Sequence, residues 1–178
     1  MQTISSRIQK SVKLSRCNAN SKKTEINVDG DETARRFCVL AAYIAESLSS
    51  RGEADAALFQ RLLPNEEDVE IIKLLWEHAV AELAGAMTDS GWKTETYDNA
   101  ATAAEDSGVM ATVKTAAADF MARCMTADWI RIRGCRPANG DMLETELADK
   151  EQAEARLQSA LATATPDRKA SPRGFPPI

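Results

Sequence analysis

His78 is the only histidine in the chain, and histidine is the side chain best suited to proton transfer near neutral pH. Glu82 follows four residues later, so a helix would place both side chains on one face. A general base also needs a reacting group within hydrogen-bond reach, and the spacing places no nucleophile beside this pair. The pattern therefore favours a histidine at a helix surface or at the edge of the core.

Two clusters of carboxylates have the composition of acid–base or metal-binding groups. One holds Glu66, Glu67, Asp68 and Glu70, and the other holds Glu144 and Glu146. Helix N-termini collect acidic residues for electrostatic reasons alone, and this interpretation is favoured for both. The chain also lacks the glycine-rich phosphate loop, the dinucleotide fingerprint, the zinc-hydrolase motif and the nucleophile elbow. The sequence thus predicts no enzyme, no catalytic residue and no cofactor.

The four cysteines stand at positions 17, 38, 124 and 135, without a CxxC pair or a neighbouring histidine. Metal sites of the cysteine/histidine type need ligands in close pairs, so no such site is predicted. Cys38 and Cys124 fall on apolar faces, where a reduced thiol behaves as a small hydrophobic group. A reducing compartment without a disulfide framework is therefore expected.

Charge is distributed unevenly. The whole chain carries −5, and because residues 1–28 carry +5 and residues 166–178 carry +2, residues 29–165 carry −12. The basic residues of the two ends are Arg7, Lys10, Lys13, Arg16, Lys22 and Lys23, then Arg168, Lys169 and Arg173. Such ends attract a polyanion or the acidic body of another copy, while the body itself repels nucleic acid.

A smaller basic group, Arg131, Arg133 and Arg136, follows Trp129 at the end of an expected helix. Arginines beside an aromatic ring suit a nucleic-acid backbone, so this group is a candidate for phosphate contact. Cations are equally favoured at a helix C-terminus without any ligand, and that structural interpretation is preferred.

A length of 178 residues with 44% hydrophobic residues suits one domain with its own core. No apolar run approaches the roughly 18 residues of a membrane span, so no membrane association is predicted. The N-terminus lacks the continuous apolar segment of a secretory signal. It is basic and contains serine, as transit peptides do, but no clear processing signal follows.

Apolar residues recur at helical spacing in four long segments. The widest apolar face belongs to Asn65–Met87, which is expected to be the central core helix. The other segments cover about 31–49, 114–133 and 141–162, with a short helical turn at 53–63. The sequence therefore predicts a mainly helical α+β fold, with a four-helix core in residues 29–165.

The helical period breaks between the second and third long helices. Trp92–Tyr97 and Val109–Val113 are rich in β-forming residues and predict a β-ribbon over residues 92–113. A two-stranded ribbon is only marginally stable, so this one must pack on the helices or be completed by another subunit. Trp92 and Tyr97 are then candidates for contact with a partner.

Both ends of the chain are expected to be flexible and basic. Residues 1–28 form a basic N-terminal arm, and two interpretations stay open: a mobile arm, or an ordered strand that pairs with another segment. Residues 166–178 form a proline-rich basic tail, which cannot be helical.

Four segments follow one another in the chain. They are ALFQRLLPNEEDVEIIKLLWEHAVAEL, which contains Trp76, the ribbon WKTETYDN…GVMATVKT, the segment TAAADFMARCMTADWIRIRG and the helix ELADKEQAEARLQSALAT. This order resembles that of small prophage-encoded virion proteins of the head-to-tail connector or tail-completion type, from phages of gut bacteria. The likeness covers about residues 57–173 and rests on element order and on the aromatic residues. Residues 1–28 are not part of it.

The resemblance implies a ring-forming homo-oligomer without an active site. Its partners would be other virion proteins (portal, adaptor or tail), in the virion or in the host cytoplasm during assembly. We therefore expect a structural virion assembly protein that forms a ring or docks onto one. The alternative is a nucleic-acid-associated module, in which the basic N-terminal arm makes weak, salt-sensitive contacts with DNA.

Overall fold

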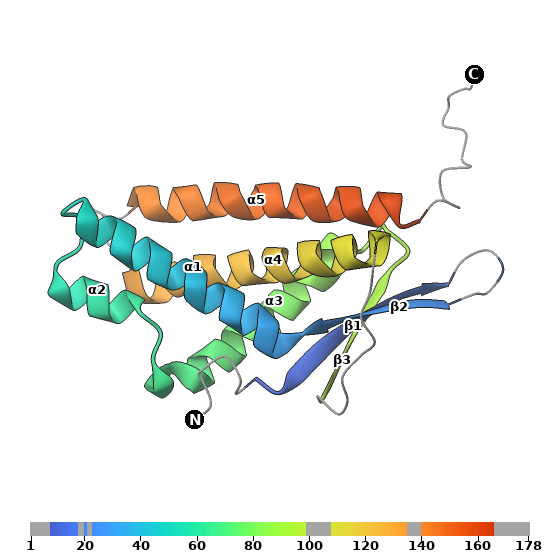
Figure 1. The fold of residues 1–178 in the computed structure, drawn as a ribbon, viewed down its shortest axis with the longest axis horizontal. Helices are drawn as coiled ribbons and strands as arrows, with labels where there is room; N and C mark the ends of the chain where they lie inside the picture. The colour runs from blue at the N-terminus through green and yellow to red at the C-terminus, as the bar shows by residue number, and fades with distance from the viewer. Residues whose placement is uncertain (1–7, 18–19, 21–22, 99–107, 135–139, 166–178) are drawn as a thin grey trace, which may run out of the picture.

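The computed structural model describes residues 8–17, 20, 23–98, 108–134 and 140–165. This part of the chain is mainly helical, with five α-helices and one three-stranded antiparallel sheet (Figure 1). The predicted class, mainly helical with a minor β component, is therefore confirmed. None of the described helices is both long enough and apolar enough to cross a membrane.

The elements follow one another in a simple order. They are β1 (Lys10–Cys17), β2 (Lys23–Asp29), α1 (Gly30–Ser50), α2 (Ala56–Leu62), the 3-10 turn η2 (Glu66–Asp68), α3 (Val69–Ala86), β3 (Lys93–Asp98), α4 (Val109–Trp129), the π-helical turn η3 (Ile130–Gly134) and α5 (Gly140–Thr163). The chain thus places two strands before the helices and returns once to the sheet between α3 and α4.

Helix α4 is the element around which the others pack. It contacts α1, α3, α5 and β2, and Figure 1 shows α5 running along it. Between Ala117 and Trp129 every residue except Asp119, Arg123 and Asp128 is buried. Alanine is frequent in this stretch, and small side chains let neighbouring helices approach closely. The expectation that Asn65–Met87 is the central helix is therefore wrong, because α3 has a solvent-facing side on which Leu74 is 64% exposed.

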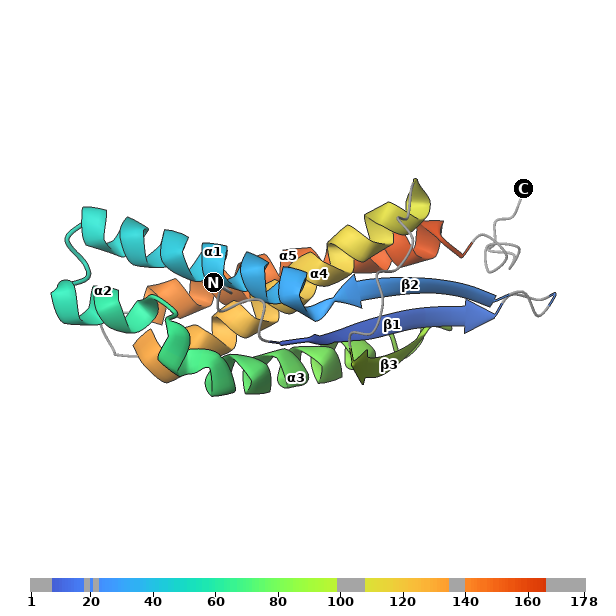
Figure 2. The ribbon, with the colours of Figure 1, turned by 60° about the horizontal axis from the view of Figure 1, so that its bottom comes forward.

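The sheet has the strand order β2-β1-β3, and one of its faces packs on the helices. Leu14 in β1 stands opposite Ile26 in β2 and Thr94 in β3. Val12, Leu14, Ile26 and Val28 are fully buried, as alternation along a half-buried strand requires. Of the two interpretations of residues 1–28, the structure therefore shows the ordered strand, since its described residues form most of the sheet (Figure 2).

The predicted second strand of the ribbon, Val109–Val113, is wrong, because these residues begin α4. β-forming composition in a short segment is outweighed here by helical packing, since Val113 is buried on the same helix side as Ala117 and Met121. Gly108 precedes the helix with a φ of +60°, a backbone conformation that glycine adopts readily because it has no Cβ atom. β3 pairs instead with β1, so the strand is completed within the chain.

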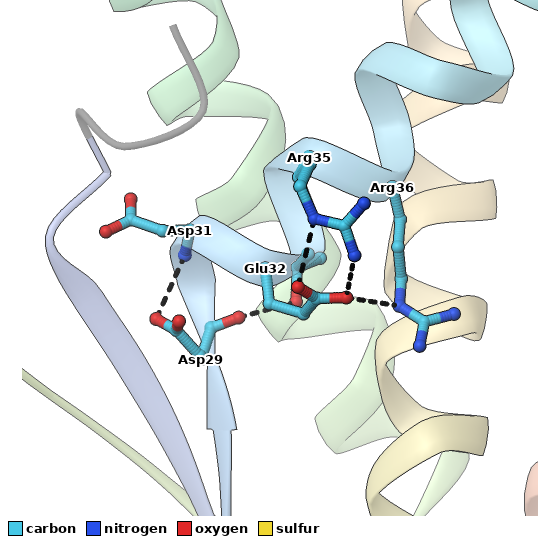
Figure 3. Close-up of polar contacts among 6 residues, drawn as sticks. Asp29, Asp31, Glu32, Arg35 and Arg36 are labelled. Carbon is cyan, nitrogen blue, oxygen red and sulfur yellow. Dashed lines mark hydrogen bonds and ion pairs between the residues drawn. The ribbon is translucent and has the colours of Figure 1, made fainter. Parts of the chain in front are cut away.

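The junction between β2 and α1 is held by local polar contacts (Figure 3). Asp29 ends the strand, and its side chain accepts a hydrogen bond of 3.1 Å from the backbone N–H of Asp31, which caps the helix. Glu32 in the first turn accepts from the Nε atoms of Arg35 at 3.1 Å and Arg36 at 3.2 Å. Acidic residues at the N-terminus of α1 also complement the helix dipole.

Gly30 is needed because α1 leaves the sheet directly beside β1. A Cβ atom at this position would lie 2.2 Å from the carbonyl oxygen of Lys10, a backbone atom that cannot move aside. The absence of a side chain at residue 30 therefore allows the sheet and the first helix to meet without a linker.

A second junction ties the ends of α2, α3 and α4 together. The Trp129 indole N–H donates to the carbonyl of Leu62 at 2.9 Å, and its ring meets Phe37 edge-on with 5.6 Å between centroids. The guanidinium of Arg133 lies 4.8 Å from the Trp129 ring centroid and donates to the buried carboxylate of Asp68. Arg133 is thus a structural cation that holds η3 against the start of α3.

We predict that Asp68→Ala lowers the free energy of unfolding by about 3 kcal/mol, measured by urea denaturation at neutral pH. The substitution leaves the three-quarters-buried Arg133 without its partner. It also removes the acceptor for the backbone N–H of Asn65, which is half of a capping box. Glu67→Ala, at the exposed neighbouring position, is the control and should cost less than about 1 kcal/mol. A similarly small effect at Asp68 would mean that this junction contributes little.

Candidate functional site: a groove between α1 and α5

The basic residues predicted as interaction candidates do not form one free surface in the described part of the chain. Lys13 and Lys23 both face Glu25, at 3.9 Å and 2.9 Å, and Lys13 lies over the ring of Tyr97. Arg16 is buried at 9% exposure, whereas Lys10 is exposed. The remaining candidates, Arg7, Lys22, Arg168, Lys169 and Arg173, lie outside the described residues.

The other predicted interaction residues have mainly structural contacts. Trp92 is buried at 4% exposure in the main core, so it is not available to a partner. The Tyr97 hydroxyl donates to the side-chain oxygen of Asn27 at 2.6 Å, across β1 from its own strand. Arg131 pairs with Asp128 at 2.9 Å. Trp92 and Arg133, which the sequence singled out as interaction candidates, therefore have packing roles in the structure.

The three described cysteines, Cys17, Cys38 and Cys124, are free thiols. Burial raises the pKa of Cys38 to about 11, and it also raises the pKa of Cys124. Both thiols therefore stay protonated near neutral pH and are poor nucleophiles. Their role as small packing groups agrees with the sequence pattern.

A groove of about 500 Å³ opens between α1 and α5, with α4 beneath it. Helices α1 and α5 both pack on α4, and the groove lies at the C-terminal half of α1 and the N-terminal half of α5, which Figure 1 shows near each other. The apolar part of its lining is Leu40, Ile44, Leu48 and Met142. Its polar part is Tyr43, Ser47, Arg51, Glu53, Arg123, Thr145, Glu146 and Asp149. Residues from three helices therefore converge on one concave surface.

The deepest polar groups of the groove are Arg123 on α4 and Glu146 on α5. Nη1 of Arg123 lies 3.5 Å from Oε2 of Glu146 and 3.5 Å from Oδ2 of Asp149. Glu146 is only 4% exposed, yet its Oε1 has no hydrogen-bond partner, and neither has the Nε of Arg123. A buried donor and a buried acceptor without partners are costly, so the site is suited to a group that satisfies both.

Burial is the main cause that raises the pKa of the Glu146 carboxyl. The guanidinium of Arg123 opposes this shift by favouring the charged form, and the nearby Asp149 carboxylate adds to it. The raised pKa means that the folded protein holds a proton on Glu146 more tightly than the unfolded chain does. Burial thus disfavours the ionised carboxylate, and a hydrogen-bond donor would stabilise it.

Tyr43 stands at the rim of the groove with 71% of its surface exposed, and Val39 lies one turn before it at 59%. Tyrosine combines a large apolar ring with a hydroxyl and often anchors protein interfaces. Together the groove presents an aromatic rim, apolar walls and a polar floor. A concave surface of this kind has room for an inserted side chain, and it does not by itself define a reaction.

His78 belongs to a separate polar cluster on the other side of α4. Its Nδ1 lies 2.7 Å from Oδ2 of Asp128 and 3.6 Å from Oε2 of Glu82, and its side chain is 57% exposed. As expected from the sequence, His78 lies at a helix surface and Glu82 lies close to its ring. The contact with Asp128 joins α3 to α4 across 50 residues, and spacing along one helix could not reveal it.

Sequence reasoning noted Glu146 only as an acidic residue near a helix N-terminus, and it missed Arg123 and Tyr43. A polar residue within an alanine-rich apolar stretch is a signal that could have singled out Arg123. Its partners lie on α5, however, and no local pattern identifies them.

No protein family model matches this chain, and no curated protein or solved structure is detectably similar to it.

We predict that Glu146 makes the folded protein less stable as the pH rises. The comparison is wild type against Glu146→Gln, with the free energy of unfolding measured by urea denaturation from pH 4 to pH 8. Because the pKa of Glu146 is raised in the folded state, wild type should lose stability relative to the variant from about pH 4.5 upward, through the raised pKa. Glu144→Gln removes an exposed carboxylate of α5 that does not line the groove; it serves as the control and should keep the pH dependence of wild type. A difference between wild type and Glu146→Gln that does not change with pH would contradict the burial of this carboxyl.

Proposed function

We propose that this protein is a structural assembly protein of the head-to-tail connector or tail-completion kind, which forms a ring or docks onto one in a virion. The observation that carries the proposal is the groove between α1 and α5. Its exposed aromatic rim and the two buried atoms without a hydrogen-bond partner, Nε of Arg123 and Oε1 of Glu146, support a surface that another chain completes.

A concave groove favours the type of contact from which rings are built. In a head-to-tail contact one surface of a subunit meets a different surface of its neighbour, and a closed ring results when the rotation between them closes. A groove takes a protruding surface of a different kind, as a head-to-tail contact requires.

Charge supports a second copy of this chain as the occupant. Residues 29–165 carry −12, while residues 1–28 carry +5 and residues 166–178 carry +2. The groove lining holds three acidic residues, Glu53, Glu146 and Asp149, against the two arginines Arg51 and Arg123. The complementarity is therefore between the acidic body of one subunit, of which the groove is part, and a basic segment of the next, and it would set the orientation of the contact.

The occupant would deliver a lysine or arginine side chain from its basic residues 166–178, because Lys13, Arg16 and Lys23 are paired or buried in the sheet. The stem of such a side chain can lie against Leu40 and Ile44, while its cationic head donates to Oε1 of Glu146. The ring of Tyr43 at the rim offers a further contact for a cation. Assembly would then weaken with salt, because part of the attraction is between exposed charges.

We predict that wild-type protein assembles, alone or with the products of neighbouring virion genes, and that Tyr43→Glu weakens this assembly at least about tenfold. Losing an aromatic anchor at an interface typically costs 2 kcal/mol or more, roughly a thirtyfold change in affinity. Mass photometry over a concentration series, at low and at high salt, measures the effect.

Leu74→Glu is the matched control for this experiment. It introduces the same charge at a 64% exposed apolar residue on α3, which does not line the groove. Its assembly should equal that of wild type. A wild-type protein that stays monomeric and binds none of the neighbouring gene products would overturn the proposal, as would equal losses for the two variants.

A further inference from the structure

We infer that His78, Glu82 and Asp128 form a binding site for one divalent transition-metal ion of the zinc type. The inference rests on the geometry between α3 and α4 and does not depend on the proposed function. His78 and Glu82 lie one turn apart on α3, and Asp128 reaches them from α4. Among the described residues this is a group of three metal-binding side chains that converge on one point.

The spacing of the ligand atoms suits an ion. One ligand atom from each of the three residues lies within 4.8 Å of the other two. In a tetrahedral site with metal–ligand bonds of about 2.0–2.2 Å, ligand atoms lie roughly 3.4 Å apart. Nδ1 of His78 is 3.6 Å from Oε2 of Glu82 and 2.7 Å from Oδ2 of Asp128. The second distance must open by somewhat less than 1 Å, which rotation of the exposed imidazole provides.

The outer oxygens of both carboxylates are already held by cations. Nζ of Lys150 on α5 lies 2.6 Å from Oε1 of Glu82, and Nη1 of Arg131 lies 2.9 Å from Oδ1 of Asp128. These contacts leave Oε2 and Oδ2 turned toward His78. Hydrogen-bonded outer partners of this kind orient metal-binding carboxylates. Their positive charges also offset those of the carboxylates, so the ion is held less tightly than it would be by the three ligands alone.

The donor set identifies the class of ion. One imidazole nitrogen and two carboxylate oxygens suit Zn²⁺, Co²⁺, Ni²⁺ or Mn²⁺, whereas Mg²⁺ and Ca²⁺ prefer oxygen ligands throughout. Binding requires a neutral imidazole, with its proton on Nε2 and the lone pair of Nδ1 directed at the ion. Because the His78 side chain is 57% exposed, water can complete the coordination.

The site would join α3 to α4, and through Lys150 it also lies against α5. An ion bound only by the folded protein adds its binding free energy to stability. Zinc binding should therefore raise the temperature of unfolding, an effect that depends on the ligands and not on assembly.

The test uses full-length protein in a Cys17→Ser/Cys135→Ser background, because an exposed thiol such as Cys17 is itself a zinc ligand. Isothermal titration with Zn²⁺ should show one site per chain, and Mg²⁺ should show none. Co²⁺ should produce the visible absorption bands of a low-symmetry site. Since His78 is the only histidine, its ring resonances in NMR spectra report directly on metal contact.

The loss of a residue that only orients a metal ligand typically weakens metal binding roughly 10–100-fold. Because His78 and Asp128 would contact the ion directly, His78→Ala and Asp128→Asn should each weaken zinc binding by more than this. Glu77→Gln removes a neighbouring exposed carboxylate outside the site and should leave the affinity unchanged. Circular dichroism verifies that each variant is folded. The inference fails if Zn²⁺ leaves the His78 resonances unmoved, if His78→Ala binds as tightly as the background protein, or if Glu77→Gln loses as much affinity as His78→Ala.

Discussion

The burial of α4 is the constraint on which the rest of this structure depends. From Ala117 to Trp129 the helix is covered by α1, α3, α5 and the sheet, so only three of its side chains reach the gaps between neighbouring elements. All three, Asp119, Arg123 and Asp128, are charged. A charge at the surface of a buried helix needs a partner, because desolvation without pairing is costly.

Each of these charges is met by residues outside α4. Asp119 pairs with Arg156 on α5, Arg123 with Glu146 and Asp149 on α5, and Asp128 with His78 on α3. The candidate sites of this molecule therefore lie where α4 meets its neighbouring helices. The pair at Asp128 is compact and converges on a single point, whereas the pair at Arg123 is loose and leaves atoms of both partners unsatisfied.

The charged contacts of α4 at Arg123 and at Asp128 suit different kinds of ligand. The groove above Arg123 has the volume, the exposed tyrosine and the unpartnered polar atoms that a neighbouring chain could complete. The cluster around His78 is small and suited to a single ion. The proposed assembly function would use both, since an ion that links α3 to α4 would stiffen the body on which the groove is built.

The amino-acid sequence by itself determined the helical class, the approximate limits of the long helices and the surface position of His78, because these follow from the periodicity of apolar residues along one segment. Only the tertiary structure decided that Lys10–Cys17 completes β3, that Val109–Val113 is helical, and that Arg123 faces Glu146. Those outcomes depend on contacts between residues far apart in the chain. Spacing along a single element carries no record of such contacts, and the buried environment that selects them exists only once the helices have packed.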